Sequence, residues 1–143
     1  MTNSISIGLV QQSCTADVDK NLESSIDGIQ SLAEKGTDVI VLPELHRTLY
    51  FCQTEDTANF DLSETIPGPT TDKLAAAAKA YSLIIIASIF ERRAKGIYHN
   101  TAVVIERDGS IAGMYRKMHP DMPEFLRDSI RHYTQQLEKS GTS

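Results

Sequence analysis

The N-terminal third of the chain constrains the fold most, because it alternates a strand pattern, a helix pattern and a second strand pattern. Apolar and small residues alternate over Ile5–Gln11, which predicts a strand. Apolar residues then recur at helical spacing from Val18 to Ala33, and Asp17 is placed to cap the helix. Residues 38–43 form a short, apolar, β-branched run that predicts a strand buried on both faces. A β-α-β unit of this kind requires a parallel pairing of its two strands.

Further along the chain, the pattern changes to hairpins. The predicted elements are a helix after the turn at 67–70, a buried strand over 83–90, and two further strands over 97–106 and 111–117. Thr70 or Thr71 is the expected helix cap. The sheet is therefore mixed, with helices packed on one face, and the fold class is α/β or α+β. An apolar stripe after Pro123 predicts a last helix.

Composition excludes several classes of protein. A chain of 143 residues with 41% apolar and 23% charged residues can bury one core, so we expect one domain. The net charge of −5 and the lack of a dense basic cluster argue against a nucleic-acid partner. The first residues lack the pattern of a signal peptide, and the longest apolar run is too short to cross a membrane. We therefore expect a cytoplasmic protein with no membrane partner.

Two charged residues stand out because each ends a predicted strand. Glu44 follows the apolar strand at residues 38–43, and strand ends of α/β sheets open into the crevice where catalytic groups gather. Lys117 ends the last predicted strand in the same way. The two charges could pair, with Glu44 as a general base and Lys117 as a cation for an oxyanion. The alternative for each is a solvated surface charge, and spacing alone favours that alternative.

Three other residues could in principle do chemistry. His46 has no second histidine or acid at ligand spacing, which favours a satisfied loop histidine over a metal ligand. Cys14 and Cys52 lie far apart without a Cys-x-x-Cys pair, so neither a disulfide framework nor a zinc site is indicated. Neither cysteine has a cationic sequence neighbour that would favour a thiolate.

Five ordered strings of residues carry a resemblance to a known family. They cover about residues 4 to 125 and are Val39–His46, Ile66–Thr70, Ile84–Glu91, Tyr98–Val104 and Asp108–His119. Together they resemble the N-terminal half of the nitrilase or carbon-nitrogen hydrolase superfamily. Tyr50–Gln53 and the pair Met118-His119 are most similar to its N-carbamoylputrescine amidase branch.

The resemblance implies a fold and a chemistry. It implies half of an α-β-β-α sandwich and a Glu-Lys-Cys triad that hydrolyses a carbamoyl or amide C–N bond through an acyl-enzyme. By residue-wise match, Glu44 would be the general base and Lys117 would stabilise the tetrahedral oxyanion. The resemblance further implies a small amide or carbamoyl amine as substrate, no cofactor, no metal, and assembly into a homo-oligomer.

The same resemblance shows what is missing from these residues. In the family the nucleophilic cysteine follows the lysine, whereas no cysteine follows Cys52 here. We therefore expect residues 1–119 to form a partial carbon-nitrogen hydrolase domain and residues 120–143 to form a divergent helical tail, not a separate domain. We expect negligible amidase activity from this chain alone. The alternative is a non-catalytic remnant, or a split-chain partner that binds a complementary C-terminal half.

Half of a two-sheet sandwich would also leave one face of its sheet bare. We expect an exposed apolar patch there, built from residues such as Ile5, Ile7, Val39, Val41, Ile84, Ile86 and Val103. Dimerisation, the terminal helix or aggregation would cover it.

Overall fold

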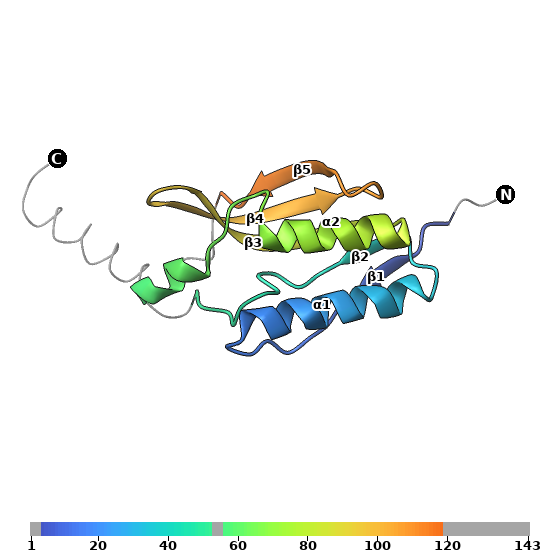
Figure 1. The fold of residues 1–143 in the computed structure, drawn as a ribbon, viewed down its shortest axis with the longest axis horizontal. Helices are drawn as coiled ribbons and strands as arrows, with labels where there is room; N and C mark the ends of the chain where they lie inside the picture. Colours follow the sequence, from blue (N-terminus) through green and yellow to red (C-terminus); the bar gives the residue numbers. More distant parts are fainter. Residues whose placement is uncertain (1–3, 53–55, 119–143) are drawn as a thin grey trace, which may run out of the picture.

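The computed structural model describes residues 4–52 and 56–118. It confirms a mixed sheet with helices (Figure 1). In chain order the elements are β1 (Ile7–Leu9), α1 (Val18–Ala33), β2 (Val39–Val41), the 3-10 helix η1 (Thr57–Leu62), α2 (Pro69–Tyr81), β3 (Ile84–Ala94), β4 (Ile97–Ile105) and β5 (Ile111–Arg116).

The five strands form one sheet in the order β1-β2-β3-β4-β5. The first three pair in parallel, with Ile7 opposite Val39 and Val39 opposite Ile84. The hairpins then make β4 antiparallel to β3 and β5 antiparallel to β4. As a result β2 and β5 run in the same direction, although two strands separate them. Their C-terminal ends therefore lie at the same end of the sheet.

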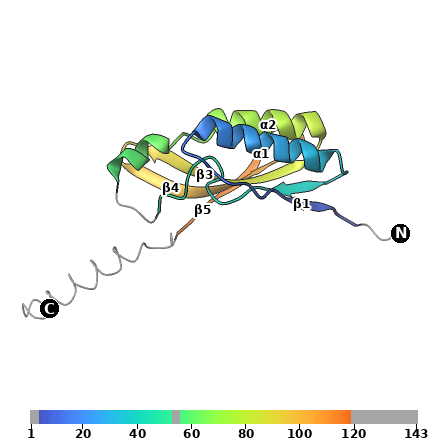
Figure 2. The same cartoon turned by 90° about the horizontal axis from the view of Figure 1, so that it is seen from below.

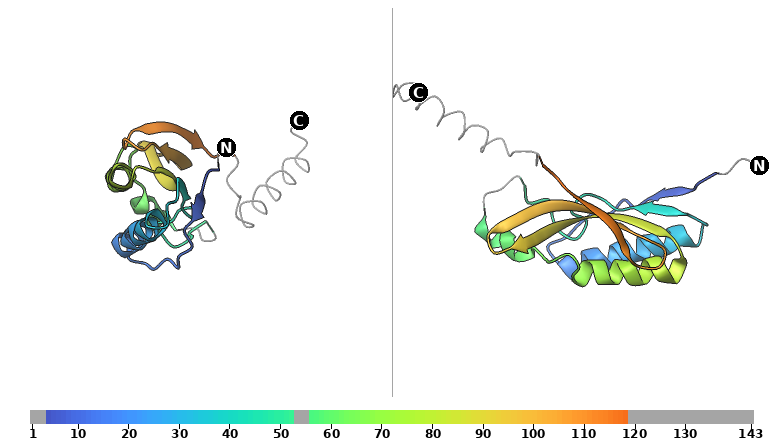
Figure 3. Two further views of the ribbon diagram at one scale, coloured as in Figure 1. Left: turned by 90° about the vertical axis from the view of Figure 1, so that its right-hand side faces the viewer. Right: turned by 90° about the horizontal axis from the view of Figure 1, so that it is seen from above.

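Both long helices cover one face of this sheet. Figure 2 shows α1 and α2 side by side above the strands, and the left panel of Figure 3 shows the same two layers from the end. The core lies between the layers, where Ile40, Ile85, Val103 and Ile105 are fully buried under Ile29 and Leu74. Removing these side chains from water is the main source of the fold's stability.

The helix ends show one correct and one wrong cap prediction. Asp17 caps α1 as expected, because its carboxylate accepts from the backbone N–H groups of Asp19 and Lys20. The cap of α2 is Gly68, so the prediction of Thr70 or Thr71 is wrong. Thr71 instead lies in the first turn, and its hydroxyl accepts from the N–H of Gly68 at 2.7 Å. Pro69 fits the first helical position because its fixed φ suits a helix start.

The strands differ from their predicted lengths. β1 and β2 are three residues each, shorter than the apolar patterns suggested, because ladder pairing ends before the pattern does. β3 is longer than predicted, at 11 residues. Residues 45–66, for which the sequence indicates no helix or strand, contain η1. The predicted last helix lies outside the described residues.

The second face of the sheet, which we call the open face, carries no helix among the described elements. Of the residues expected in the apolar patch, Ile5 and Ile7 are confirmed at 70% and 64% exposed, whereas Val39, Val41, Ile84 and Ile86 are half-buried. Leu9, on the same face as Ile7, is 68% exposed. Val103 was wrongly placed in it, because its side chain is fully buried under the helices. Side chains alternate along a strand, so Val103 and its neighbours Ala102 and Val104 point to opposite faces. None of the described helices is both long and apolar enough to cross a bilayer.

Candidate active site

Glu44 and Lys117 lie at the same end of the sheet. Glu44 follows β2, separated from it by Leu42 and Pro43, and Lys117 directly follows β5. Since β2 and β5 run in the same direction, the two side chains leave the sheet at one edge. The topology therefore places at one end of the sheet two residues that are far apart in the sequence.

The two side chains form an ion pair. Lys117 Nζ lies 3.1 Å from Glu44 Oε1, so the predicted pairing of these charges is confirmed. The pair spans the sheet end, because β3 and β4 lie between β2 and β5. The Glu44 side chain is 44% exposed and that of Lys117 is 31% exposed. A pair this exposed adds little to stability, and it is open to a small molecule.

Asn100 also binds the Glu44 carboxylate. Its amide nitrogen Nδ2 donates to Glu44 Oε1 at 2.5 Å. Its amide oxygen accepts from the Ser88 hydroxyl at 2.8 Å, and Ser88 Oγ in turn accepts from the N–H of Leu45 at 3.1 Å. Asn100 and Ser88 come from the open face of β4 and β3. Sequence reasoning did not single out either residue as part of the site.

A pocket of about 350 Å³ opens beside Lys117. Its lining is largely apolar and consists of Leu45, Phe51, Cys52, Phe90, Tyr98, His99, Asn100, Lys117 and Met118. Apolar walls with a few polar groups at one end are typical of small-molecule sites. Lys117, Asn100 and His99 supply polar groups here.

Three aromatic residues, Phe51, Phe90 and Tyr98, line this pocket, and the ring of Phe60 packs against two of them. Phe51 and Phe90 lie 4.8 Å apart between ring centroids, and Phe60 stacks on Tyr98 at 4.5 Å. Phe60 comes from η1, so this short helix places an aromatic ring against Phe90 and Tyr98 of the sheet. Contacts of this kind stabilise beyond the area that they bury.

The turn after Glu44 is held by contacts from several elements. Leu45 adopts a left-handed backbone conformation with φ of 51°, which is costly for a branched side chain and persists only where the surroundings fix it. Ser88 binds its N–H, as described above. The next carbonyl, that of His46, accepts from Gln12 Nε2 at 2.8 Å and from Cys14 Sγ at 3.3 Å.

His46 is a buried structural residue. Its ring is fully buried, and Nδ1 lies 2.8 Å from Ser25 Oγ on α1. Burial lowers the pKa of the His46 imidazole from 6.5 to about 4, and the charge of Arg47 adds to this effect. The imidazole is therefore neutral at pH 7. The interpretation as a satisfied loop histidine is confirmed for Nδ1, whereas Nε2 has no hydrogen-bond partner among the described residues.

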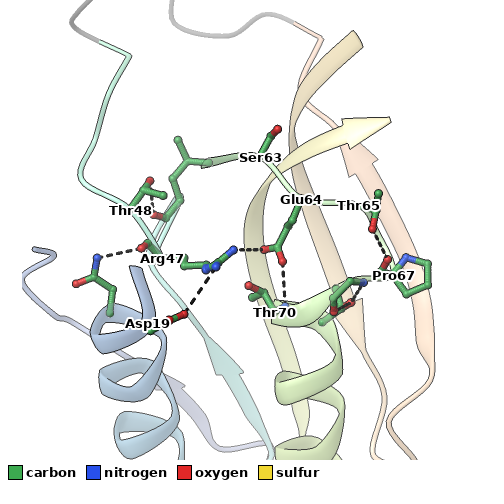
Figure 4. A network of polar contacts seen from close by, with 12 residues as sticks. Asp19, Arg47, Thr48, Ser63, Glu64, Thr65, Pro67 and Thr70 are labelled. Atoms are coloured by element: carbon green, nitrogen blue, oxygen red, sulfur yellow. Dashed lines mark hydrogen bonds and ion pairs between the residues drawn. The ribbon is translucent and has the colours of Figure 1, made fainter. Parts of the chain in front are cut away.

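Arg47 ties the same turn to both helices. Figure 4 shows its side chain between Glu64 and Asp19. Arg47 Nη1 lies 3.4 Å from Glu64 Oε1, and Nη2 lies 3.9 Å from Asp19 Oδ1 in the first turn of α1. The other oxygen of Glu64 accepts from the N–H of Thr70 at the start of α2, at 3.0 Å. A carboxylate is favourable at that position because helix N-termini carry partial positive charge.

The two cysteines lie in different places. Cys14 serves the turn, as its thiol donates to the His46 carbonyl. Cys52 lines the pocket with Lys117 and Asn100. Across residues 4–52 and 56–118 no group of three or more His, Cys, Asp or Glu side chains is placed to hold a metal ion.

Comparisons with known proteins all point to one family. The model of the carbon-nitrogen hydrolase family matches residues 6–139. An N-carbamoylputrescine amidase from Solanum lycopersicum is 32% identical over 123 residues, which is 85% of this chain and 41% of that protein. A citrullinase from Francisella tularensis is 37% identical over 119 residues, covering 82% of this chain and 41% of that protein.

The structural comparison agrees. The crystal structure of a carbon-nitrogen hydrolase from Helicobacter pylori G27 matches with a TM-score of 0.77 and 42% sequence identity. That match covers 82% of this chain and 41% of the Helicobacter pylori chain. The 143 residues thus span about two fifths of the length of the relatives they match.

Proposed function

The chain belongs to the carbon-nitrogen hydrolase family, and from that premise we propose that Glu44 and Lys117 are the base and the cation of a Glu-Lys-Cys amidase site. We further propose a substrate of the N-carbamoylputrescine type. The observation that carries the first proposal is the contact of 3.1 Å between Glu44 Oε1 and Nζ of Lys117, a residue that also lines the apolar pocket. The substrate rests on similarity to the N-carbamoylputrescine amidase of Solanum lycopersicum.

In this mechanism Glu44 accepts the proton of a cysteine thiol. The sulfur attacks the carbamoyl carbon, and the ammonium of Lys117 stabilises the oxyanion of the tetrahedral intermediate. The C–N bond to the terminal amide then breaks, and ammonia leaves with the proton that Glu44 returns. Water, activated by Glu44, cleaves the thioester to a carbamate and frees the thiol. The carbamate gives the amine and carbon dioxide.

The source of the thiol is part of the proposal. No cysteine follows Cys52 in the 143 residues, and we assign the nucleophile to a segment beyond them. Cys14 is engaged with the His46 carbonyl, away from the pocket lining. Cys52 lines the pocket, which makes it the cysteine to test as an alternative nucleophile.

A second proposal is binding without catalysis. The open face exposes Ile5, Ile7 and Leu9 by 64 to 70%, and a face this apolar favours association. On this account the chain binds a complementary C-terminal half, and residues 120–143 form a divergent tail that does not supply the site. Association into homo-oligomers is the competing use of the same face.

The test is a complemented chain, in which residues 1–118 are joined to the part of the Helicobacter pylori hydrolase that follows its matched segment. We expect it to release ammonia from N-carbamoylputrescine in preference to citrulline and formamide, and we expect Lys117→Met to remove that activity. The 143-residue chain alone should release none. Ammonia release by that chain that disappears in Cys52→Ser would identify Cys52 as the nucleophile and overturn our assignment.

A further inference from the structure

We infer that Asn100 is a positioning residue that fixes the Glu44 carboxylate so that Oε2 is the oxygen that takes the proton. The inference rests on the proposed function, since it concerns the base of that same site. It depends on a series of hydrogen bonds in which the donor and acceptor of each bond are fixed by the bond before it.

The donor-to-acceptor direction of these hydrogen bonds is set by a main-chain N–H group. The N–H of Leu45 can only donate, so Ser88 Oγ must accept it at 3.1 Å. The single hydrogen of the Ser88 hydroxyl is then available for Asn100 Oδ1, 2.8 Å away. With its oxygen turned to Ser88, the Asn100 amide presents Nδ2 to Glu44 Oε1. An ionised carboxylate only accepts hydrogen bonds, so each group in the series has a matched partner.

Asn100 also sets the position of Lys117. The N–H of Lys117 donates to the Asn100 carbonyl at 2.8 Å. One residue of β4 therefore holds the main chain of Lys117 and the side chain of Glu44. Their relative placement does not depend on the exposed ion pair alone, which is too weak to impose geometry.

The two donors act on one oxygen of the carboxylate. Asn100 Nδ2 and Lys117 Nζ both bind Oε1, and Oε2 receives no hydrogen bond from the described residues. The lone pairs of Oε2 are therefore the ones available to the thiol and to the water of the second step. A general base works only when its accepting atom is within hydrogen-bond reach of the proton, so fixing this oxygen matters for rate.

The first test follows the Asn100 side-chain amide by NMR in the 143-residue chain. We expect its Nδ2 protons to exchange with water roughly tenfold or more slowly than those of Asn59, which lies in η1 outside this network. Ser88→Ala should remove the difference, and Ser88→Thr should keep it because the hydroxyl remains. Glu44→Ala, a change at the exposed end of the network, should also speed up exchange. Equal exchange of Asn100 and Asn59, or slow exchange that survives Ser88→Ala, overturns the inference.

The second test uses the complemented chain. Asn100→Asp replaces the donor by an acceptor of the same shape and should lower kcat by roughly 100-fold with KM unchanged. Asn59→Asp adds the same charge outside the network and should leave kcat unchanged. If Asn100→Asp only lowers the amount of folded protein and leaves kcat per folded molecule unaltered, a positioning role is contradicted.

The two tests separate the inference from the proposed function. The exchange measurement involves no substrate, so it decides the geometry even if the complemented chain hydrolyses nothing. Slow exchange together with an inactive complemented chain would leave the network intact and reject the amidase site.

Discussion

Arg116 and Lys117 are consecutive basic residues that point to opposite faces of one sheet, and the two faces use them differently. Arg116 makes two contacts of 2.7 Å with Glu91, whose side chain is 2% exposed. Those hydrogen bonds lower the pKa of the Glu91 carboxyl. Lys117 Nζ contacts Glu44 Oε1 at 3.1 Å on the open face. The pair of Arg116 and the buried Glu91 on the covered face links two strands of the sheet. The pair of Lys117 and Glu44 on the open face is exposed, so a substrate can reach it.

The largest expected effect tests where stability comes from. Ile85 is fully buried under the helices, so Ile85→Ala should lower the free energy of unfolding by about 3 kcal/mol through lost burial and a cavity. Ile7 is 64% exposed on the open face, and Ile7→Ala should cost less than about 1 kcal/mol. Urea denaturation of the 143-residue chain measures both. Equal losses would mean that the open face is buried in solution.

The next prediction concerns how the free energy of unfolding changes with pH. The pKa of His46 falls from 6.5 to about 4 on folding, so between these values the unfolded chain binds a proton that the folded chain does not. Stability is therefore unaffected by this group above pH 6.5 and decreases as the pH falls towards 4, by about 3 kcal/mol in total. His46→Asn should flatten this dependence. Denaturation midpoints recorded between pH 4 and 7 decide it, and an equal slope in both proteins would contradict the assignment to His46.

A smaller effect compares the two basic residues directly. Arg116→Met should lower the urea midpoint clearly, because it leaves the buried Glu91 carboxylate without its main partner. Lys117→Met should leave the midpoint nearly unchanged, because both partners of that pair contact water. Matched losses in the two variants would remove the contrast between the faces.

The sequence predicted the elements with strong periodicity. The helix from Val18 and its Asp17 cap were predictable because amphipathic spacing and capping are local. The contact of Glu44 with Lys117 was anticipated from strand ends, and its role as an active site was supplied by the family resemblance. Strand ends were less accurate, since pairing with neighbours decides where a ladder stops.

The support around the site was not predictable from local patterns. Ser88 and Asn100 meet because of the register between β3 and β4, which no single segment encodes. The placement of Arg47 between Glu64 and Asp19 depends on how three segments pack. Asn100 does lie in the string Tyr98–Val104 that carried the resemblance, so a search for polar residues on the open face of that strand could have found it.

The rate of ammonia release from N-carbamoylputrescine by the complemented chain, compared between Glu44→Gln and Glu23→Gln, tests the central claim most directly. Glu23 is an exposed carboxylate of α1, so its variant controls for the loss of one negative charge. We predict that Glu44→Gln lowers the rate by roughly 1,000-fold or more while Glu23→Gln keeps it. Equal rates in the two variants would show that Glu44 is not the base.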